Sequence, residues 1–156
     1  MTSTFAFVAL APDPPDQRER AARPGTRVDD VAVAARPILV VDDDPEILAM
    51  LRDFLESEGL AVRTAANGAE ALEALDDVMP ALILLDMRMP VLDGWAFAQR
   101  FHERALTYPI VVMTAAESAR RWAEEIGATG YIAKPFDVNE LLETIERHRQ
   151  KDSKPN

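Results

Sequence analysis

Five side chains of complementary chemistry each follow a short apolar run of the sequence. Asp42 and Asp43 come directly after ILVV, and Asp86 follows ALILL. Thr114 follows IVVM, and Lys134 follows YIA. Carboxylates gathered at one place repel one another unless a cation lies among them, and oxygen donors open to phosphate suit Mg²⁺. A carboxylate nucleophile, a divalent metal, an ammonium and a hydroxyl are together the groups needed to form and hold an aspartyl phosphate.

A parallel sheet would bring these groups to one edge. From Arg36 onward, short apolar runs alternate with amphipathic stretches, which is typical of βα units. Ligands of open α/β sheets bind beyond the carboxyl ends of the strands. We therefore expect an α/β fold, a doubly wound five-stranded parallel sheet in the order 2-1-3-4-5, with strand two, which ends without a reactive group, at the edge. The predicted strands are 38–41, 61–65, 81–85, 110–113 and 131–133, and the predicted helices are 45–58, 68–75, 94–104, 117–126 and 138–148.

Residues at the predicted helix ends support these boundaries. Asp44 precedes Pro45 and is a good N-cap, so we assign Asp44 to capping rather than to the acidic site. Asp93 opens the third helix, and Gly59 and Gly127 end the first and fourth. Apolar residues recur at helical spacing inside the first helix and predict core positions.

Composition narrows the class of protein. The 156 residues are 48% hydrophobic and 28% charged, as in a globular domain, and there is no cysteine for a disulfide, a zinc site or a thiol nucleophile. A reducing cytoplasm is the expected location. The net charge is −10, and residues 37–148 carry −12, because charges balance in residues 1–36 and residues 149–156 carry +2. This charge disfavours nucleic-acid binding, and no apolar run is long enough for membrane insertion.

The segments outside 37–148 show no sustained period. Residues 1–36, with PDPP and RERAARPGTR, are interpreted as a disordered N-terminal extension. FAFVAL could instead pack as an extra strand or helix, and 31–35 could form a short helical lead-in. Residues 149–156 are expected to be a short flexible tail.

The motifs ILVVDDDPEI, ALILLDMRMPVLDGWAF, VVMTA and GATGYIAKPFD together resemble the receiver domain of two-component response regulators. The resemblance covers 37–148 and includes the spacings of 28 residues from Asp86 to Thr114 and 20 residues from Thr114 to Lys134. It implies a flavodoxin-like receiver fold. It also implies a signalling switch that catalyses only its own phosphorylation and dephosphorylation.

By this resemblance, Asp86 accepts a phosphoryl group from a phosphohistidine on a sensor histidine kinase or a histidine phosphotransfer protein. Asp43 is then a direct Mg²⁺ ligand, Asp86 also belongs to the metal site, and Asp42 supports the metal largely through water. Arg88 would offer its backbone carbonyl as a further ligand.

The same resemblance assigns the switch. Thr114 and Lys134 would contact the phosphoryl group, and the Lys134–Pro135 peptide would be cis. Tyr131 would swing inward as Thr114 moves, altering a surface that binds a downstream protein target. No further domain follows in this sequence, so the output would be a protein contact or an onward phosphotransfer, unless the chain is a fragment.

Two other functions stay open. A haloacid-dehalogenase-like phosphatase would use Asp42 and Asp44 as its DxD pair, but that interpretation leaves Asp86 unexplained. The second alternative is a receiver-like module that binds partners without being phosphorylated.

His102 and His148 lie in predicted helices without a Ser/His/Asp arrangement and are expected at the surface. Trp122 is either a partner contact or a half-buried core residue.

Overall fold

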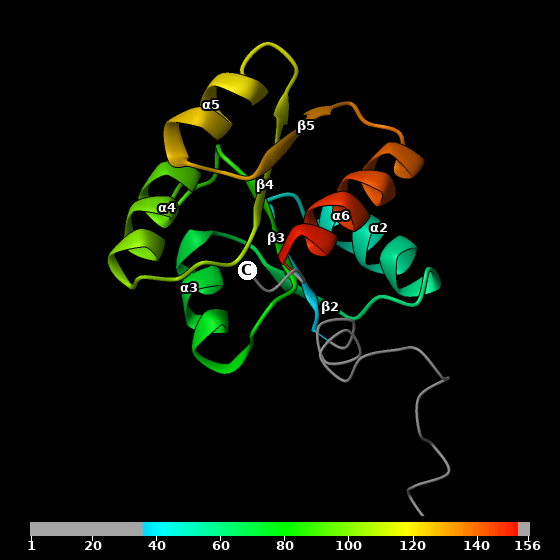
Figure 1. The fold of residues 1–156 in the computed structure, drawn as a ribbon, viewed down its shortest axis with the longest axis horizontal. Coiled ribbons are helices and arrows are strands. Elements are labelled where there is room, and N and C mark those ends of the chain that lie inside the picture. The colour runs from blue at the N-terminus through cyan, green and yellow to red at the C-terminus, as the bar shows by residue number, and fades with distance from the viewer. Residues whose placement is uncertain (1–35, 153–156) are drawn as a thin grey trace, which may run out of the picture.

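The computed structural model describes residues 36–152, with side chains described as far as residue 149. It contains one five-stranded parallel sheet with the strand order β2-β1-β3-β4-β5 (Figure 1). The predicted fold class and strand order are therefore confirmed. The strands are β1 (Ile38–Val41), β2 (Val62–Ala65), β3 (Leu82–Asp86), β4 (Ile110–Ala115) and β5 (Gly130–Lys134). The helices are α2 (Pro45–Ser57), α3 (Gly68–Asp77), α4 (Gly94–Glu103), α5 (Ala119–Ile126) and α6 (Val138–Asp152).

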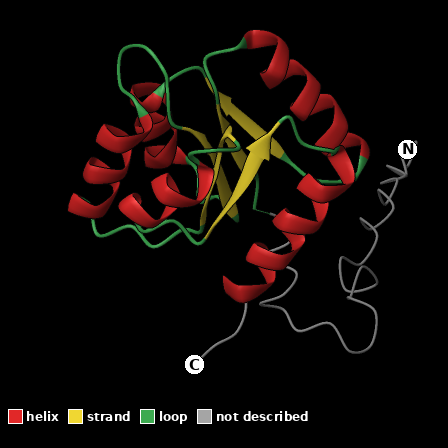
Figure 2. Ribbon diagram, turned by 90° about the horizontal axis from the view of Figure 1, so that it is seen from above, coloured by secondary structure: helices red, strands yellow, loops and turns green. Residues whose placement is uncertain are grey.

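Helices cover both faces of the sheet (Figures 1 and 2). One core cluster joins alternate residues of β1, β3 and β4 to α3, α4 and α5, and it contains Phe97, Phe101 and Trp122. The other joins the opposite residues of these strands to α2 and α6 through Leu51, Leu55, Leu141 and Ile145. Every residue of β1 and β3 is buried, as unbroken apolar runs require in a parallel sheet covered on both sides.

The edge position of β2 agrees with its burial. Arg63 is exposed and Ala65 is buried within this strand. An edge strand is covered less completely than a central one, which agrees with the sequence VRTA being less apolar than ILVV in β1.

Capping side chains set the helix ends that were predicted. The Asp44 carboxylate accepts the backbone N–H of Glu46, and the Asp93 carboxylate accepts that of Ala96. Gly127 ends α5 at φ 68°, in the left-handed region that glycine adopts without strain.

The last helix corrects two expectations. α6 continues to Asp152, four residues past the predicted end at 148, so it includes the first part of the segment expected to be a tail. An Arg149–Glu146 ion pair of 2.7 Å supports this extra turn. His148 is buried, with 7% of its surface exposed, because it continues the face formed by Leu141 and Ile145. The prediction of a surface position was therefore wrong for His148, whereas His102 is exposed.

The interpretations of FAFVAL, of 31–35 and of the last four residues lie outside the described residues. Within 36–152, no helix has both the length and the apolar character needed to cross a membrane.

Candidate functional site

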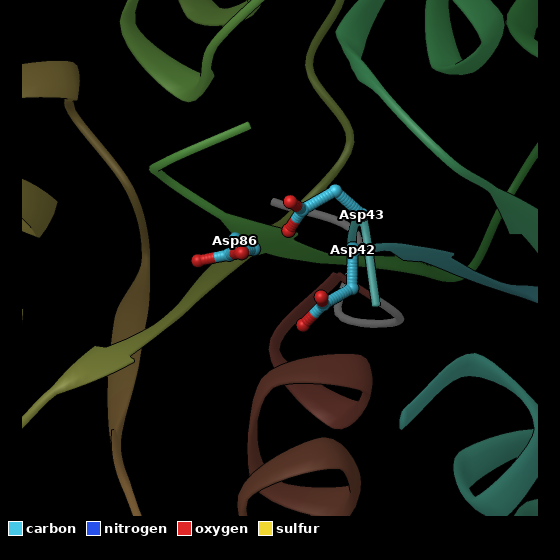
Figure 3. Close-up of side chains that lie close together, drawn as sticks. All are labelled: Asp42, Asp43 and Asp86. Carbon is cyan, nitrogen blue, oxygen red and sulfur yellow. The ribbon is translucent and has the colours of Figure 1, made fainter. Parts of the chain in front are cut away.

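Three carboxyl groups gather where β1 and β3 end (Figure 3). One oxygen of each of Asp42, Asp43 and Asp86 lies within 4.8 Å of the others. Asp42 and Asp86 are buried, and Asp43 is exposed. The structure thus brings together the three acids that the sequence singled out.

Strand pairing places these acids side by side. Val41 of β1 is in register with Leu85 of β3, so the next residue of each strand is an aspartate. The backbone N–H of Asp44 donates to Oδ1 of Asp42 at 2.9 Å, which fixes the turn from β1 into α2. The apolar strands therefore set the separation of the acids, and the turn sets their direction.

Lys134 brings a positive charge to the same place. Its Nζ lies 2.8 Å from Oδ2 of Asp42 and 3.9 Å from Oδ2 of Asp86, and 25% of its side chain is exposed. Its register partner on β4 is Ala115. The Lys134–Pro135 peptide is cis, as expected. The ammonium offsets part of the repulsion among the acids in the metal-free protein.

Burial and neighbouring charges shift the acid at the end of β3. Loss of hydration on burial raises the pKa of Asp86 from 3.8 to about 6, against the opposing attraction of Lys134. The charges of Asp42 and Asp43 add to the rise, whereas a hydrogen bond from the Arg88 backbone N–H lowers the pKa. A cation among the acids would favour the charged carboxylate.

The two predicted switch residues lie on adjacent strands. Thr114 is buried near the end of β4 and is in register with Ala133 of β5. Tyr131 is 47% exposed, so its ring is turned outward in this structure. The switch role of the two residues stays a prediction.

Arg88 lies in the loop after β3, as the resemblance requires, and its backbone N–H reaches Asp86. Its guanidinium carbon lies 5.1 Å from the centre of the Trp122 ring. The carbonyl role predicted for Arg88 stays a prediction. Spacing along the chain gave no signal for the contact with Trp122, because that contact depends on the packing of α5.

An apolar pocket beside the site was also missed. It has a volume of about 400 Å³ and is lined by Ile47, Met50, Pro135, Phe136 and Lys134. Ile47, one of the apolar residues at helical spacing in α2, is only partly buried. Met50, one turn further along α2, is exposed, and no pattern in the sequence indicates this exposure.

The residues present fit a magnesium ion. Mg²⁺ prefers hard oxygen donors and is held in proteins by one or two carboxylates with water completing its shell. Two buried and one exposed carboxylate at this spacing provide such donors, and the exposed Asp43 leaves a side open to solvent.

A family model for the response regulator receiver domain matches residues 38–146. The chain belongs to this family, which confirms the resemblance drawn from its motifs. The family is that of signalling switches in two-component systems.

Individual relatives agree with this membership. The chain is 39% identical over 123 residues to the DNA-binding transcriptional regulator NtrC of Escherichia coli K12, covering 76% of this chain and 26% of that protein. It therefore spans about a quarter of the NtrC length. It is 38% identical over 120 residues to an uncharacterized 14.6 kDa protein of Leptolyngbya boryana, of which 92% is covered.

Solved structures show the same fold. A CheY-like receiver domain protein from Methanospirillum hungatei aligns with a TM-score of 0.68 and 30% identity, over 74% of this chain and 94% of that one. The receiver domain of NtrX from Brucella abortus aligns with a TM-score of 0.67 and 32% identity, over 72% and 98%.

Proposed function

We propose that this protein is a phosphorylation-activated switch in which Asp86 is the phosphoryl acceptor. The observation that carries the proposal is the convergence of three carboxylates and the Lys134 ammonium at the carboxyl edge of the sheet. Family membership supports the reaction class. The donor would be a phosphohistidine of a sensor histidine kinase or a phosphotransfer protein.

The reaction transfers one phosphoryl group between two side chains. An oxygen of the Asp86 carboxylate attacks phosphorus, and the bond from phosphorus to the donor imidazole nitrogen breaks. The nitrogen keeps the electron pair of that bond, and Asp86 becomes an acyl phosphate. Later attack of water on phosphorus returns the carboxylate and releases inorganic phosphate.

The chain's own residues hold the reacting groups. Asp43, Asp86 and the Arg88 carbonyl would hold Mg²⁺ together with Asp42, which would act largely through water. The bound ion would neutralise charge on the phosphoryl oxygens. Lys134 is already 3.9 Å from Asp86 and would pair with the transferred group, while the Thr114 hydroxyl would donate a hydrogen bond to it.

The output is a changed surface rather than a released product. Movement of Thr114 toward the phosphoryl group would vacate space that Tyr131 fills from its present outward position. The surface of α5, β5 and α6 would then bind a downstream protein target. The acidic domain disfavours nucleic acid as the direct partner, and we place the protein in the cytoplasm. It would act on no substrate beyond its own phosphorylation and dephosphorylation.

The apolar pocket supports a protein as the phosphoryl donor. Met50 and Phe136 lie beside Lys134, so a donor protein can cover apolar surface while its phosphohistidine reaches Asp86. A small phosphomonoester would make no use of this surface.

Capping weakens the phosphatase alternative. That function needs Asp44 to aim its carboxylate at the site, but Asp44 accepts the Glu46 backbone N–H at 2.9 Å as the cap of α2. Binding without phosphorylation is less favoured, because the complete acidic site and its lysine are present.

Intact-mass measurement tests the proposal. With acetyl phosphate and Mg²⁺, the wild type is expected to gain the mass of one phosphoryl group, and Asp86→Asn to gain none. The matched control is Asp53→Asn, which alters an exposed aspartate on α2 and should be labelled normally. Labelling of Asp86→Asn, or continuous turnover of a phosphomonoester by the wild type, would contradict the proposal.

A further inference from the structure

The side chain of Arg88 is directed at an aromatic ring although it is a cation rooted beside three acids. Its guanidinium carbon lies 5.1 Å from the centre of the Trp122 ring, within the range of a cation–π contact. None of the ion pairs between described side chains involves Arg88. The Lys134 ammonium, not the Arg88 guanidinium, serves the acidic site.

The ring that Arg88 contacts is firmly held. Trp122 is 6% exposed and belongs to the core beneath α5. Its ring meets that of Trp95 on α4 edge to face, with centroids 4.8 Å apart. The Trp95 indole N–H donates to Glu125 of α5 at 3.0 Å. Trp122 is thus a fixed platform tied to both helices.

The backbone of Arg88 lies beside the acidic site, while its guanidinium packs on the Trp122 ring. The Arg88 backbone N–H is near enough to Asp86 to lower the pKa of that carboxyl group. The residue therefore joins the acidic site to α5 across the short loop that follows β3. A loop residue whose side chain is held in this way loses less conformational freedom when its backbone binds a ligand.

We propose that Arg88 is a positioning residue, whose guanidinium, held against Trp122, fixes the loop backbone at the metal site and couples occupation of that site to α5. This inference rests on the proposed Mg²⁺ site. Coupling is reciprocal, so Mg²⁺ must strengthen the Arg88–Trp122 contact, and with it the hold of the loop on α5, to the same extent that the contact favours Mg²⁺.

Replacing Arg88 by a neutral residue changes Mg²⁺ affinity in opposite directions, depending on whether the charge of Arg88 or its positioning of the loop matters more. Replacing a cation near an acidic metal site by a neutral side chain makes the local potential more negative and, by charge alone, strengthens Mg²⁺ binding. Loss of the Arg88–Trp122 contact, if that contact positions the loop, instead weakens Mg²⁺ binding. Arg88→Met keeps an unbranched side chain at an exposed position, so folding of this variant is not at risk.

Calorimetric titration with Mg²⁺ at fixed ionic strength measures the effect. We expect Arg88→Met to bind Mg²⁺ roughly threefold to tenfold more weakly than the wild type, the scale of one cation–π contact. Arg88→Lys should lie between the two, because an ammonium also attracts the ring. Trp122→Phe should weaken binding moderately, and adding it to Arg88→Met should cause no further loss. The control Arg120→Met removes an exposed charge of α5 that is paired with Glu124 and should not weaken binding.

Hydrogen exchange supplies a second measurement. Mg²⁺ should slow exchange of the α5 amides in the wild type and should slow it less in Arg88→Met. Equal or tighter Mg²⁺ binding by Arg88→Met, or unchanged slowing at α5, overturns the positioning role while the proposed function stands. A wild type that binds no Mg²⁺ overturns both.

Discussion

Burial of Asp86 makes the stability of the metal-free protein depend on pH. The carboxyl group has a pKa of about 6 in the folded protein and 3.8 as its ordinary value, so the folded state binds this proton more tightly. The stabilisation that results is complete below the ordinary pKa and is lost as the pH rises through 6. At neutral pH, ionised Asp86 therefore lowers the free energy of unfolding.

Asp86→Asn is expected to be more stable than the wild type by about 1 to 3 kcal/mol at pH 7.5 without metal, following about 1.4 kcal/mol per pKa unit. The difference should shrink below pH 6 and nearly vanish at pH 4. Urea unfolding in the presence of a chelator at both pH values measures it. Asp53→Asn, an exposed change, should show no such dependence, and an Asp86→Asn variant less stable than wild type at pH 7.5 would contradict the raised pKa.

At the scale of elements, the packing of α6 against β5 depends on the absence of a side chain at Gly130. A Cβ built at Gly130 would overlap the buried imidazole of His148, with Cε1 only 2.6 Å away. His148 is buried, so its ring would have to shift within the packed core to make room.

Gly130→Ala should therefore lower the free energy of unfolding by about 1 to 3 kcal/mol, the usual cost of overpacking. In a His148→Ala background the same change should cost clearly less, because the space is then open. Denaturant unfolding of the four proteins in this cycle measures the coupling. An equal cost in both backgrounds would show that His148 does not limit the space at Gly130.

The elements themselves could be predicted because β1, β3 and β4 are apolar runs and because capping residues or a glycine mark the ends of α2, α4 and α5. The structure moved ten of the twenty predicted boundaries by one or two residues and left nine unchanged. The end of α6 lies four residues beyond the predicted end, because Arg149 pairs with Glu146 in an additional turn. The residues of that turn, RQKD, include no apolar residue that would predict it. The spacing of His148 after Leu141 and Ile145 indicates burial, whereas its residue type favours a surface position, and in the structure the spacing prevails.

At the scale of the whole molecule, the acidic site could be predicted from the sequence, whereas the contact between Arg88 and Trp122 could not. Strand ends in a parallel sheet must meet at one edge, so Asp42, Asp86 and Lys134 converge whatever the loops do. The contact of Arg88 with Trp122 depends instead on the rotation of α5 about its axis. That rotation is set by packing across the sheet, and local spacing does not encode it.

The described residues contain both core clusters and the complete acidic site. Residues 1–36 have neither the periodicity nor the apolar density of a core segment, so we expect them to add little to folding. Deleting residues 1–35 should change the free energy of unfolding by less than about 1 kcal/mol, the scale of one ordinary destabilising substitution. Mg²⁺ affinity should also stay the same, because every proposed ligand is retained. Urea unfolding and Mg²⁺ titration of the full and shortened chains measure both quantities. A larger loss of stability would show that the segment packs on the domain, and a change in Mg²⁺ affinity alone would place it near the acidic edge.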